Sequence, residues 1–355
     1  MTGTLASVSL YARLAELPLQ IDTYELENRS RAVSSAFTRR TTVIRLRGDG
    51  SEGHGEDVTY EAADHDALQA AGAVLPLAGA YTLGSFAELL DELDLFPAPP
   101  GGEVFRLYRR WGFEASALDL ALRQAGRSLA EAVDRLPRPV RFVVSMRLGE
   151  PPSAGPVRRW LERYPDLRFK LDPTSSWDES LIAQLVETGA VDSVDFKGAY
   201  KGTVVDQPPD PVLYERVAEA FPHAWLEDPA LTPETDGVLA PHRSRITWDA
   251  VIHSVADIEE LPFPPAMLNI KPSRFGTLKA LLEAYEFCEA NGIESYGGGQ
   301  FELGPGRDQI QYLASLFHPH APNDVAPGPY NDPEPVHGLP QSPLPSPSPA
   351  PGFRL

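Results

Sequence analysis

Residues 142–171 read FVVSMRLGEPPSAGPVRRWLERYPDLRFKL. This segment contains an apolar run at 142–146, an amphipathic helical stretch at 155–163 and a second apolar run at 167–171. Further apolar runs follow at similar intervals, and helical stretches such as 179–188 and 277–291 lie between them. These runs are residues 193–196, 224–227, 245–249, 267–271, 293–296 and 323–325. Alternation of this kind predicts a parallel (β/α) barrel, with a doubly wound parallel sheet as the alternative.

The 355-residue chain divides into three regions. Residues 1–103 have the pattern of an α+β domain, and residues 104–330 contain the barrel. Residues 331–355 include eight prolines, which lack backbone donors, so we expect a disordered proline-rich tail. Within the first region we predict strands at 21–27 and 42–47, a turn at 48–50, helices at 62–71 and 86–95, and a boundary at the Pro/Gly run 97–102.

Net charge and cysteine content exclude several functions. Fifty acidic residues against 31 Lys and Arg give a formal charge of −19, which repels nucleic acid and anionic lipid. The single cysteine, Cys288, permits neither an intramolecular disulfide nor a cysteine-based metal site. The sequence shows no signal peptide and no apolar run long enough to span a bilayer, so we expect a cytoplasmic protein.

Charged residues recur where the apolar runs end. Parallel strands end on one face of a barrel, the face where barrel enzymes place their active sites, so these side chains should converge there. In chain order they are Lys170, Asp195, Glu227, Asp249 and Lys271.

The order of these charges suggests a reaction. Three carboxylates held together require a neutralising cation, and an all-oxygen ligand set favours Mg²⁺, or Mn²⁺, over Zn²⁺. Two lysines flanking the cation can act as acid and base. The set suits abstraction of a proton α to a carboxylate, with the metal stabilising the enediolate.

Several motifs make the sequence similar to a known family. They resemble the enolase superfamily, in the mandelate racemase/muconate-lactonising-enzyme branch that also contains o-succinylbenzoate synthases and dipeptide epimerases. The matching segments are Gly48-Asp49-Gly50 with Gly53-His54-Gly55-Glu56, residues 115–121 with 126–129, Trp225-Leu226-Glu227-Asp228-Pro229, Asn269-Ile270-Lys271-Pro272-Ser273-Arg274-Phe275-Gly276, and Gly297-Gly298-Gly299-Gln300-Phe301-Glu302.

The resemblance implies a fold and roles for particular residues. The fold is a (β/α)₇β TIM-like barrel with an α+β capping domain, completed by a C-terminal return. Asp195, Glu227 and Asp249 would bind Mg²⁺, Lys170 and Lys271 would be the acid/base pair, and specificity would come from cap loops within residues 26–39. We predict substrate contacts from five residues: Arg168, Lys197, Gly298, Gln300 and Glu302.

The sequence departs from the family pattern on three strands. Lys-x-Lys becomes Arg168-Phe169-Lys170; a shifted register would put Asp172 in the lysine position, but we prefer the one that keeps the base. Asp-x-Asn becomes Asp195-Phe196-Lys197, where the new lysine either adds charge at the metal or points outward. The Asp-Glu pair becomes Asp249-Ala250.

These observations predict a Mg²⁺-dependent lyase or isomerase that acts on a small carboxylate through an enediolate. Elimination, as in o-succinylbenzoate synthesis, needs one lysine as base, whereas racemisation or epimerisation uses both, and the sequence does not separate them. Cycloisomerisation is a further option. The alternative is an inactive enolase-like barrel that binds a small acid or a protein. Nucleic acid and membrane are not expected as partners, and a homo-oligomer is an open option.

Overall fold

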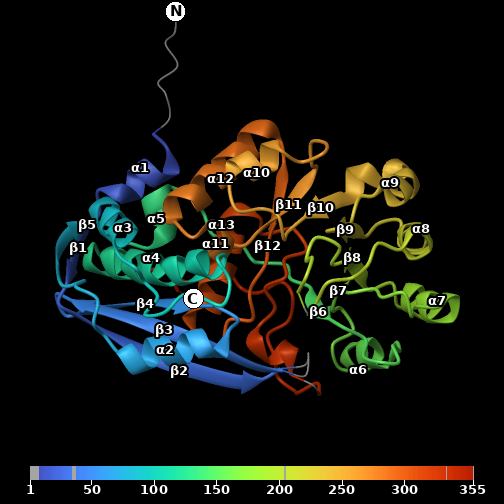
Figure 1. Ribbon diagram of the computed structural model, residues 1–355, viewed down its shortest axis with the longest axis horizontal. Helices are drawn as coiled ribbons and strands as arrows, with labels where there is room; N and C mark the ends of the chain where they lie inside the picture. The colour runs from blue at the N-terminus through green and yellow to red at the C-terminus, as the bar shows by residue number, and fades with distance from the viewer. Residues whose placement is uncertain (1–7, 34–36, 204, 333, 355) are drawn as a thin grey trace, which may run out of the picture.

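The computed structural model describes residues 8–33, 37–203, 205–332 and 334–354. It has an α+β cap and, beside it, a barrel of parallel strands enclosed by helices (Figure 1). The predicted fold class, a (β/α)₇β TIM-like barrel with an α+β capping domain, is confirmed.

Seven strands of the barrel form one parallel sheet in which each strand pairs with its neighbours in the chain. This sequential order excludes the doubly wound alternative, in which the strand order reverses at a switch point. The strands correspond to the first seven apolar runs and are β6 (Val144–Met146), β7 (Phe169–Leu171), β8 (Val191–Asp195), β9 (Trp225–Glu227), β10 (Ile246–Trp248), β11 (Met267–Ile270) and β12 (Glu294–Gly297).

The eighth apolar run, residues 323–325, closes the barrel through isolated bridges. Asn323 forms a parallel bridge with Phe142, just before β6, and Asp324 forms one with Gly298, just after β12. The buried Asn323 amide also hydrogen-bonds the backbone of both flanking segments. The first and last strands are therefore joined through this short segment.

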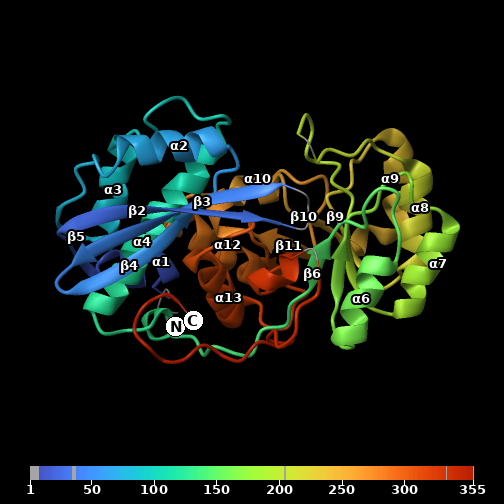
Figure 2. The same ribbon diagram turned by 90° about the horizontal axis from the view of Figure 1, so that it is seen from below.

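Helices connect successive strands on the outside of the sheet (Figure 2). Side-chain caps fix where several begin: Asp178, Asp210 and Thr277 each accept a backbone N–H in the first turn of the following helix. The helices are α6 (Gly155–Arg163), α7 (Glu179–Thr188), α8 (Pro211–Ala220), α9 (Pro233–Leu239), α10 (Val255–Glu259), α11 (Pro272–Phe275), α12 (Leu278–Asn291) and α13 (Pro305–Phe317), with 3₁₀ turns at Ala240–Arg245 and Gly328–Asn331.

The cap contains two antiparallel sheets and the predicted tight turn. Asp49 and Gly50 both have positive φ between β3 and β4, as a two-residue hairpin turn requires. The first sheet has β2 (Thr23–Ala32), β3 (Thr38–Gly48) and β4 (Ser51–Asp57), and the second pairs β1 (Pro18–Ile21) with β5 (Gly79–Thr82). The helices of the cap in this part of the chain are α1 (Leu10–Ala15), α2 (Ala62–Ala71) and α3 (Leu83–Glu92).

The boundary expected at residue 103 needs correction, because α4 (Phe105–Gln124) packs against the cap sheet. Glycines permit this close approach. A Cβ atom on Gly53 would lie 2.3 Å from the Ser116 carbonyl oxygen, and one on Gly55 would lie 1.9 Å from that of Gly112. The cap therefore includes α4, and α5 (Leu129–Val133) leads from it into the barrel.

The expectation of a disordered tail is also wrong. Leu344 is buried and forms an antiparallel bridge with Val140, and Phe353 is fully buried with its ring against Trp111 and Tyr312. Proline removes donors but does not prevent the apolar residues between prolines from packing. The segment runs along the barrel to the cap (Figure 2), and it is the C-terminal return that the resemblance implied.

Two expectations from the composition can be compared with this fold. Cys288 lies in the core at 1% exposure, where a thiol packs as a small apolar group. Among the described residues no helix combines the length and apolar character needed to cross a bilayer.

The buried end of the tail gives a stability prediction. Phe353→Ala removes a ring packed between cap and barrel, so the free energy of unfolding should fall by about 3–5 kcal/mol. Urea denaturation measures this change, and Val336→Ala, at an exposed position of the same segment, is the control. A loss below about 0.5 kcal/mol for Phe353→Ala would show that the tail does not stabilise the fold.

Candidate active site

The five charged residues predicted at the strand ends lie together. Asp195 and Glu227 are the last residues of β8 and β9 and are paired in the sheet register. Asp249 and Lys271 directly follow β10 and β11, and Lys170 is the central residue of β7. All five are at most 5% exposed, so the cluster is shielded from water.

Lys170 is surrounded by carboxylates. Its ammonium lies 3.1 Å from Asp195 Oδ2 and donates a hydrogen bond to Glu227 Oε1. Burial alone would lower the pKa of Lys170, but the charges of Asp195 and Glu227 outweigh it and raise this pKa well above 10.5. Lys170 is therefore an ammonium in this arrangement, and it could act as a base only if the nearby negative charge were neutralised. The structure places Lys170, and not Asp172, among the carboxylates.

Lys271 lies on the opposite side of the cluster and contacts a different carboxylate. Its Nζ donates to Asp249 Oδ2 at 2.7 Å, and the same oxygen accepts from Tyr200 Oη at 2.7 Å and Arg274 Nη2 at 3.3 Å. Although burial opposes ionisation, Arg274 and Lys271 hold the pKa of Asp249 well below its usual range. Since β7 and β11 are four positions apart in an eight-membered barrel, the two lysines approach the centre from opposite walls.

The carboxylates fit a hard divalent cation. One oxygen from each of Asp195, Glu227 and Asp228 lies within 4.8 Å of the others, and among the described residues Asp249, the third predicted ligand, is not part of this group. Asp249 Oδ1 is buried and, within the described part of the chain, has no hydrogen-bond partner. A buried oxygen normally has a partner, so this one fits coordination to a cation. Burial and the charge of Asp195 raise the pKa of Glu227, and a divalent cation would favour its ionised form. Oxygen ligands of this kind suit Mg²⁺ or Mn²⁺.

Asp228 is a residue of this cluster that the sequence analysis did not assign. Adjacent residues of a strand point to opposite faces, so Glu227 at the centre implied Asp228 outside. Asp228 instead has a φ of 46°, and its two oxygens accept the backbone N–H groups of Asp249 and Ala250 at 2.8 and 2.9 Å. Burial together with Asp249 and Asp195 raises the pKa of Asp228 to about 7. Asp228 therefore positions the end of β10, and one of its oxygens belongs to the group of carboxylates that could hold a cation.

Lys197, which replaces asparagine in the family pattern, points inward. Its φ of 55° turns the chain after β8, and its ammonium bonds Asp195 Oδ2 and lies 4.0 Å from Asp172 Oδ1. Two ammonium groups, from Lys170 and Lys197, thus share one carboxylate oxygen. A metal ion at Asp195 must compete with both.

The residues predicted on the seventh strand lie near Lys271 and at the junction with the cap. A Cβ atom on Gly298 would lie 2.6 Å from Lys271 Cε, so the missing side chain leaves room for the lysine. The Gln300 amide bonds the hydroxyls of Tyr60 and Tyr108, and Glu302 is paired with Arg307 at 3.0 Å. Substrate contacts by these three residues remain a prediction.

The structure does not bring Arg168 to the carboxylate cluster, and the substrate contact predicted for it stays a prediction. Its guanidinium bonds Asp192, at the start of β8, and the Gly189 carbonyl, both at the end of the barrel opposite the carboxylate cluster. Although Arg168 is two residues from Lys170, it precedes β7, and its long side chain turns toward the amino-terminal end.

The cap segment expected to govern specificity, residues 26–39, lies partly outside the described residues, which omit 34–36. The described part belongs mainly to β2 and the start of β3. The buried Arg39 guanidinium donates to the carbonyls of Gln300 and Phe301, just beyond β12. This end of the cap hairpin is therefore fixed to the barrel beside the predicted substrate residues.

Comparisons with known proteins match both parts of the chain. Family models described as "Domain of unknown function (DUF8230)", N-terminal and C-terminal domains, match residues 12–132 and 136–332. A curated relative, N-succinylamino acid racemase from Thermus thermophilus, is 25% identical over 346 residues, with 88% of this chain and 84% of the relative covered.

Solved structures show the same fold at low identity. A dipeptide epimerase from Enterococcus faecalis superposes with a TM-score of 0.68 at 16% identity, covering 94% of this chain and 99% of its own. An enolase-superfamily member from Listeria innocua has a TM-score of 0.67 at 18% identity, covering 87% and 86%. The resemblance to the enolase superfamily is thus confirmed at the level of the fold.

The contact between Lys197 and Asp195 leads to a binding prediction. Lys197→Asn removes an ammonium that competes for a metal-binding oxygen, so the affinity for Mn²⁺ should rise roughly ten- to hundredfold, the equivalent of one charged hydrogen bond. Titration followed by the electron paramagnetic resonance of free Mn²⁺ measures it. Lys201→Asn, the same charge change at an exposed position nearby, is the control. Equal affinities of the two variants would contradict competition.

Proposed function

The chain belongs to the DUF8230 family, and from the geometry of its active site we propose that it is a Mg²⁺-dependent isomerase that removes and returns a proton α to a carboxylate. One observation carries this proposal: two buried lysines face a buried carboxylate cluster from opposite walls of the barrel. A planar intermediate between them could receive a proton on either face. Both groups required for a two-base isomerisation are therefore within one closed site.

The protein's own residues have separate tasks in this proposal. Asp195, Glu227 and Asp249, with Asp228 beside them, would hold the divalent cation, which when bound would stabilise the negative charge developing on the substrate carboxylate. Lys170 and Lys271 would exchange protons with the α carbon. Asp249 orients Lys271 at 2.7 Å, so a member of the metal-ligand set also fixes an acid/base group.

N-acylated amino acids are the substrate class that we propose. The curated relative is named for racemisation of N-succinylamino acids, and a structural neighbour for epimerisation of dipeptides. Both names describe compounds that contain an amino acid acylated on nitrogen with a free carboxylate, which in a dipeptide is the C-terminal residue. These names favour isomerisation over elimination, the lyase alternative, whereas the lysine pair fits both, because in elimination the second lysine could stabilise charge.

Several further expectations stay proposals of the same kind. We propose a small carboxylate as the ligand, with neither nucleic acid nor membrane as a partner, and a cytoplasmic location. Homo-oligomerisation is compatible with the fold. The alternative to the enzyme is a binding protein that retains the barrel without turnover, and the ion pair between Lys197 and Asp195 is the observation in its favour.

Hydrogen exchange in D₂O tests the assignment of the two bases. With Mg²⁺ present, each enantiomer of N-succinylphenylalanine should lose its α proton, as followed by proton NMR. Lys271→Ala should lower exchange from one enantiomer, and Lys170→Ala from the other, by at least about a hundredfold, the contribution of general acid–base catalysis. Lys279→Ala, at an exposed position of α12, should exchange as the unaltered protein does.

Two outcomes would contradict this assignment. Turnover that survives both lysine substitutions would exclude Lys170 and Lys271 as the bases. If the unaltered protein folds and binds Mg²⁺ but exchanges no α proton of N-acylamino acids or dipeptides, the binding protein is the better description.

A further inference from the structure

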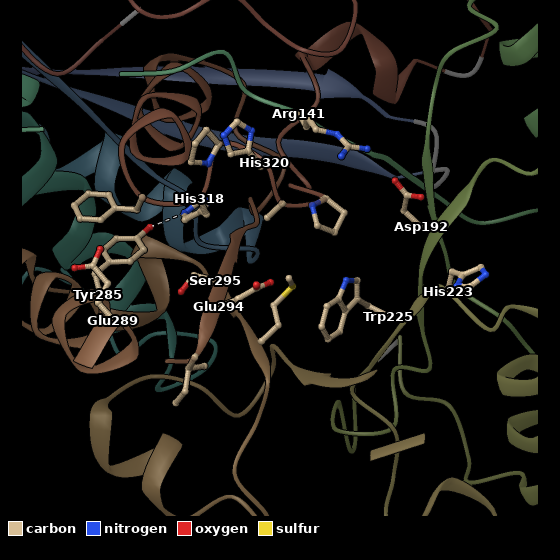
Figure 3. A pocket seen from close by; sticks show the side chains of 16 residues that line it. Arg141, Asp192, His223, Trp225, Tyr285, Glu289, Glu294, Ser295, His318 and His320 are labelled. Atoms are coloured by element: carbon tan, nitrogen blue, oxygen red, sulfur yellow. Dashed lines mark hydrogen bonds between the residues drawn. The ribbon is translucent and has the colours of Figure 1, made fainter. Parts of the chain in front are cut away.

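A second pocket lies at the amino-terminal end of the barrel (Figure 3). Its volume is about 520 Å³, within the range of small-molecule sites. The residues around it are the first residues of β9, β11 and β12 and the loop after α13. Glu227 and Lys271 lie at the other ends of these strands, so this pocket is separate from the proposed active site.

The wall toward the barrel is apolar. Trp225 and Met267 begin β9 and β11, and Phe317 and Ile293 continue the apolar surface beside them. Trp225 is only partly buried, so its indole ring offers surface to a ligand. Large apolar and aromatic surfaces of this kind provide most of the affinity in small-molecule sites.

The charged residues of the lining divide into paired and unpaired groups. Asp192 is bonded to Arg168 at 2.9 Å, and Glu289 is paired with Arg135 at 2.6 Å. Arg141 and Glu294 are exposed, and within the described ranges their side chains have neither a hydrogen bond nor an ion pair. The pocket therefore presents one unpaired cation and one unpaired anion at its exposed rim, beside an apolar wall.

A buried polar network holds this pocket in shape. Asn323 donates to the carbonyls of Arg141, His318 and Ala321 at 2.9, 2.9 and 3.0 Å. The His318 ring bonds Asn323 Oδ1 at 2.6 Å and the Tyr285 hydroxyl at 3.0 Å. Burial lowers the pKa of His318 to about 4, so the ring stays neutral near pH 7 and brings no charge into the network. A preformed site loses little entropy when a ligand binds.

We propose that this pocket binds a free α-amino acid with a large apolar side chain. The ligand carboxylate would pair with Arg141, its ammonium with Glu294, and its side chain would lie on Trp225 and Met267. A simple anion would be attracted by Arg141 but repelled by Glu294, and a simple cation would be attracted by Glu294 but repelled by Arg141. A zwitterion with an apolar body satisfies both charges and the wall together.

Calorimetric titration of the full-length protein tests this site, with L-phenylalanine as the probe. We expect saturable binding of one equivalent. N-acetyl-L-phenylalanine lacks the ammonium and L-phenylalaninamide lacks the carboxylate, so each should bind at least about tenfold more weakly. Arg141→Gln and Glu294→Gln should each weaken L-phenylalanine binding by a similar factor. Glu289→Gln, which alters a paired carboxylate of the same lining, should change it little.

The active-site variant Lys271→Ala separates this site from the proposed function, because it should bind L-phenylalanine as the unaltered protein does. Loss of binding in Lys271→Ala would place the ligand in the active site and overturn the proposal. Absence of binding up to about 10 mM would also overturn it, as would equal affinity for the N-acetyl compound or unchanged affinity in both Arg141→Gln and Glu294→Gln. Thermal unfolding at the temperature of the unaltered protein confirms that these variants fold.

Discussion

Burial of opposite charges inside the barrel is the constraint on which the rest of the site depends. Asp195 and Asp249 are fully buried, and each is stable there because an ammonium group lies beside it: Lys170 at 3.1 Å from Asp195 and Lys271 at 2.7 Å from Asp249. Losing one partner of such a pair typically costs about 3–5 kcal/mol. The barrel must therefore keep the ends of β7, β8, β10 and β11 in register, and the same register places the two lysines opposite each other.

The cap and the tail maintain this register from outside. Glycines 53 and 55 bring α4 against the cap sheet, and Arg39 ties the cap to the backbone just after β12. The tail returns from the barrel to place Phe353 between a cap helix and α13. Asn323 closes the barrel and also supports the pocket at its amino-terminal end, so one buried amide contributes to both features.

The sequence predicted those features that follow from a regular period. Apolar runs at barrel spacing predicted eight strands, of which seven form the parallel sheet and the eighth closes it through isolated bridges, and charges at the ends of these runs predicted the cluster. It missed two features where the backbone breaks the period: Asp228 joins the cluster through a left-handed turn, and the side chain of Arg168 turns away from Lys170. It also failed for the tail, because proline content does not report whether Leu344 and Phe353 find a surface to cover. The second pocket depends on residues distant in sequence, which no local pattern brings together.

We infer that the carboxylate cluster holds a divalent cation between two opposed lysines. Anomalous diffraction from crystals soaked in Mn²⁺ would show whether an ion lies there. We expect a single peak coordinated by Asp195, Glu227 and Asp249, with the Lys197 ammonium displaced from Asp195. A cluster without a peak, in which Lys170 and Lys197 remain on Asp195 at saturating Mn²⁺, would exclude a metal site between the lysines.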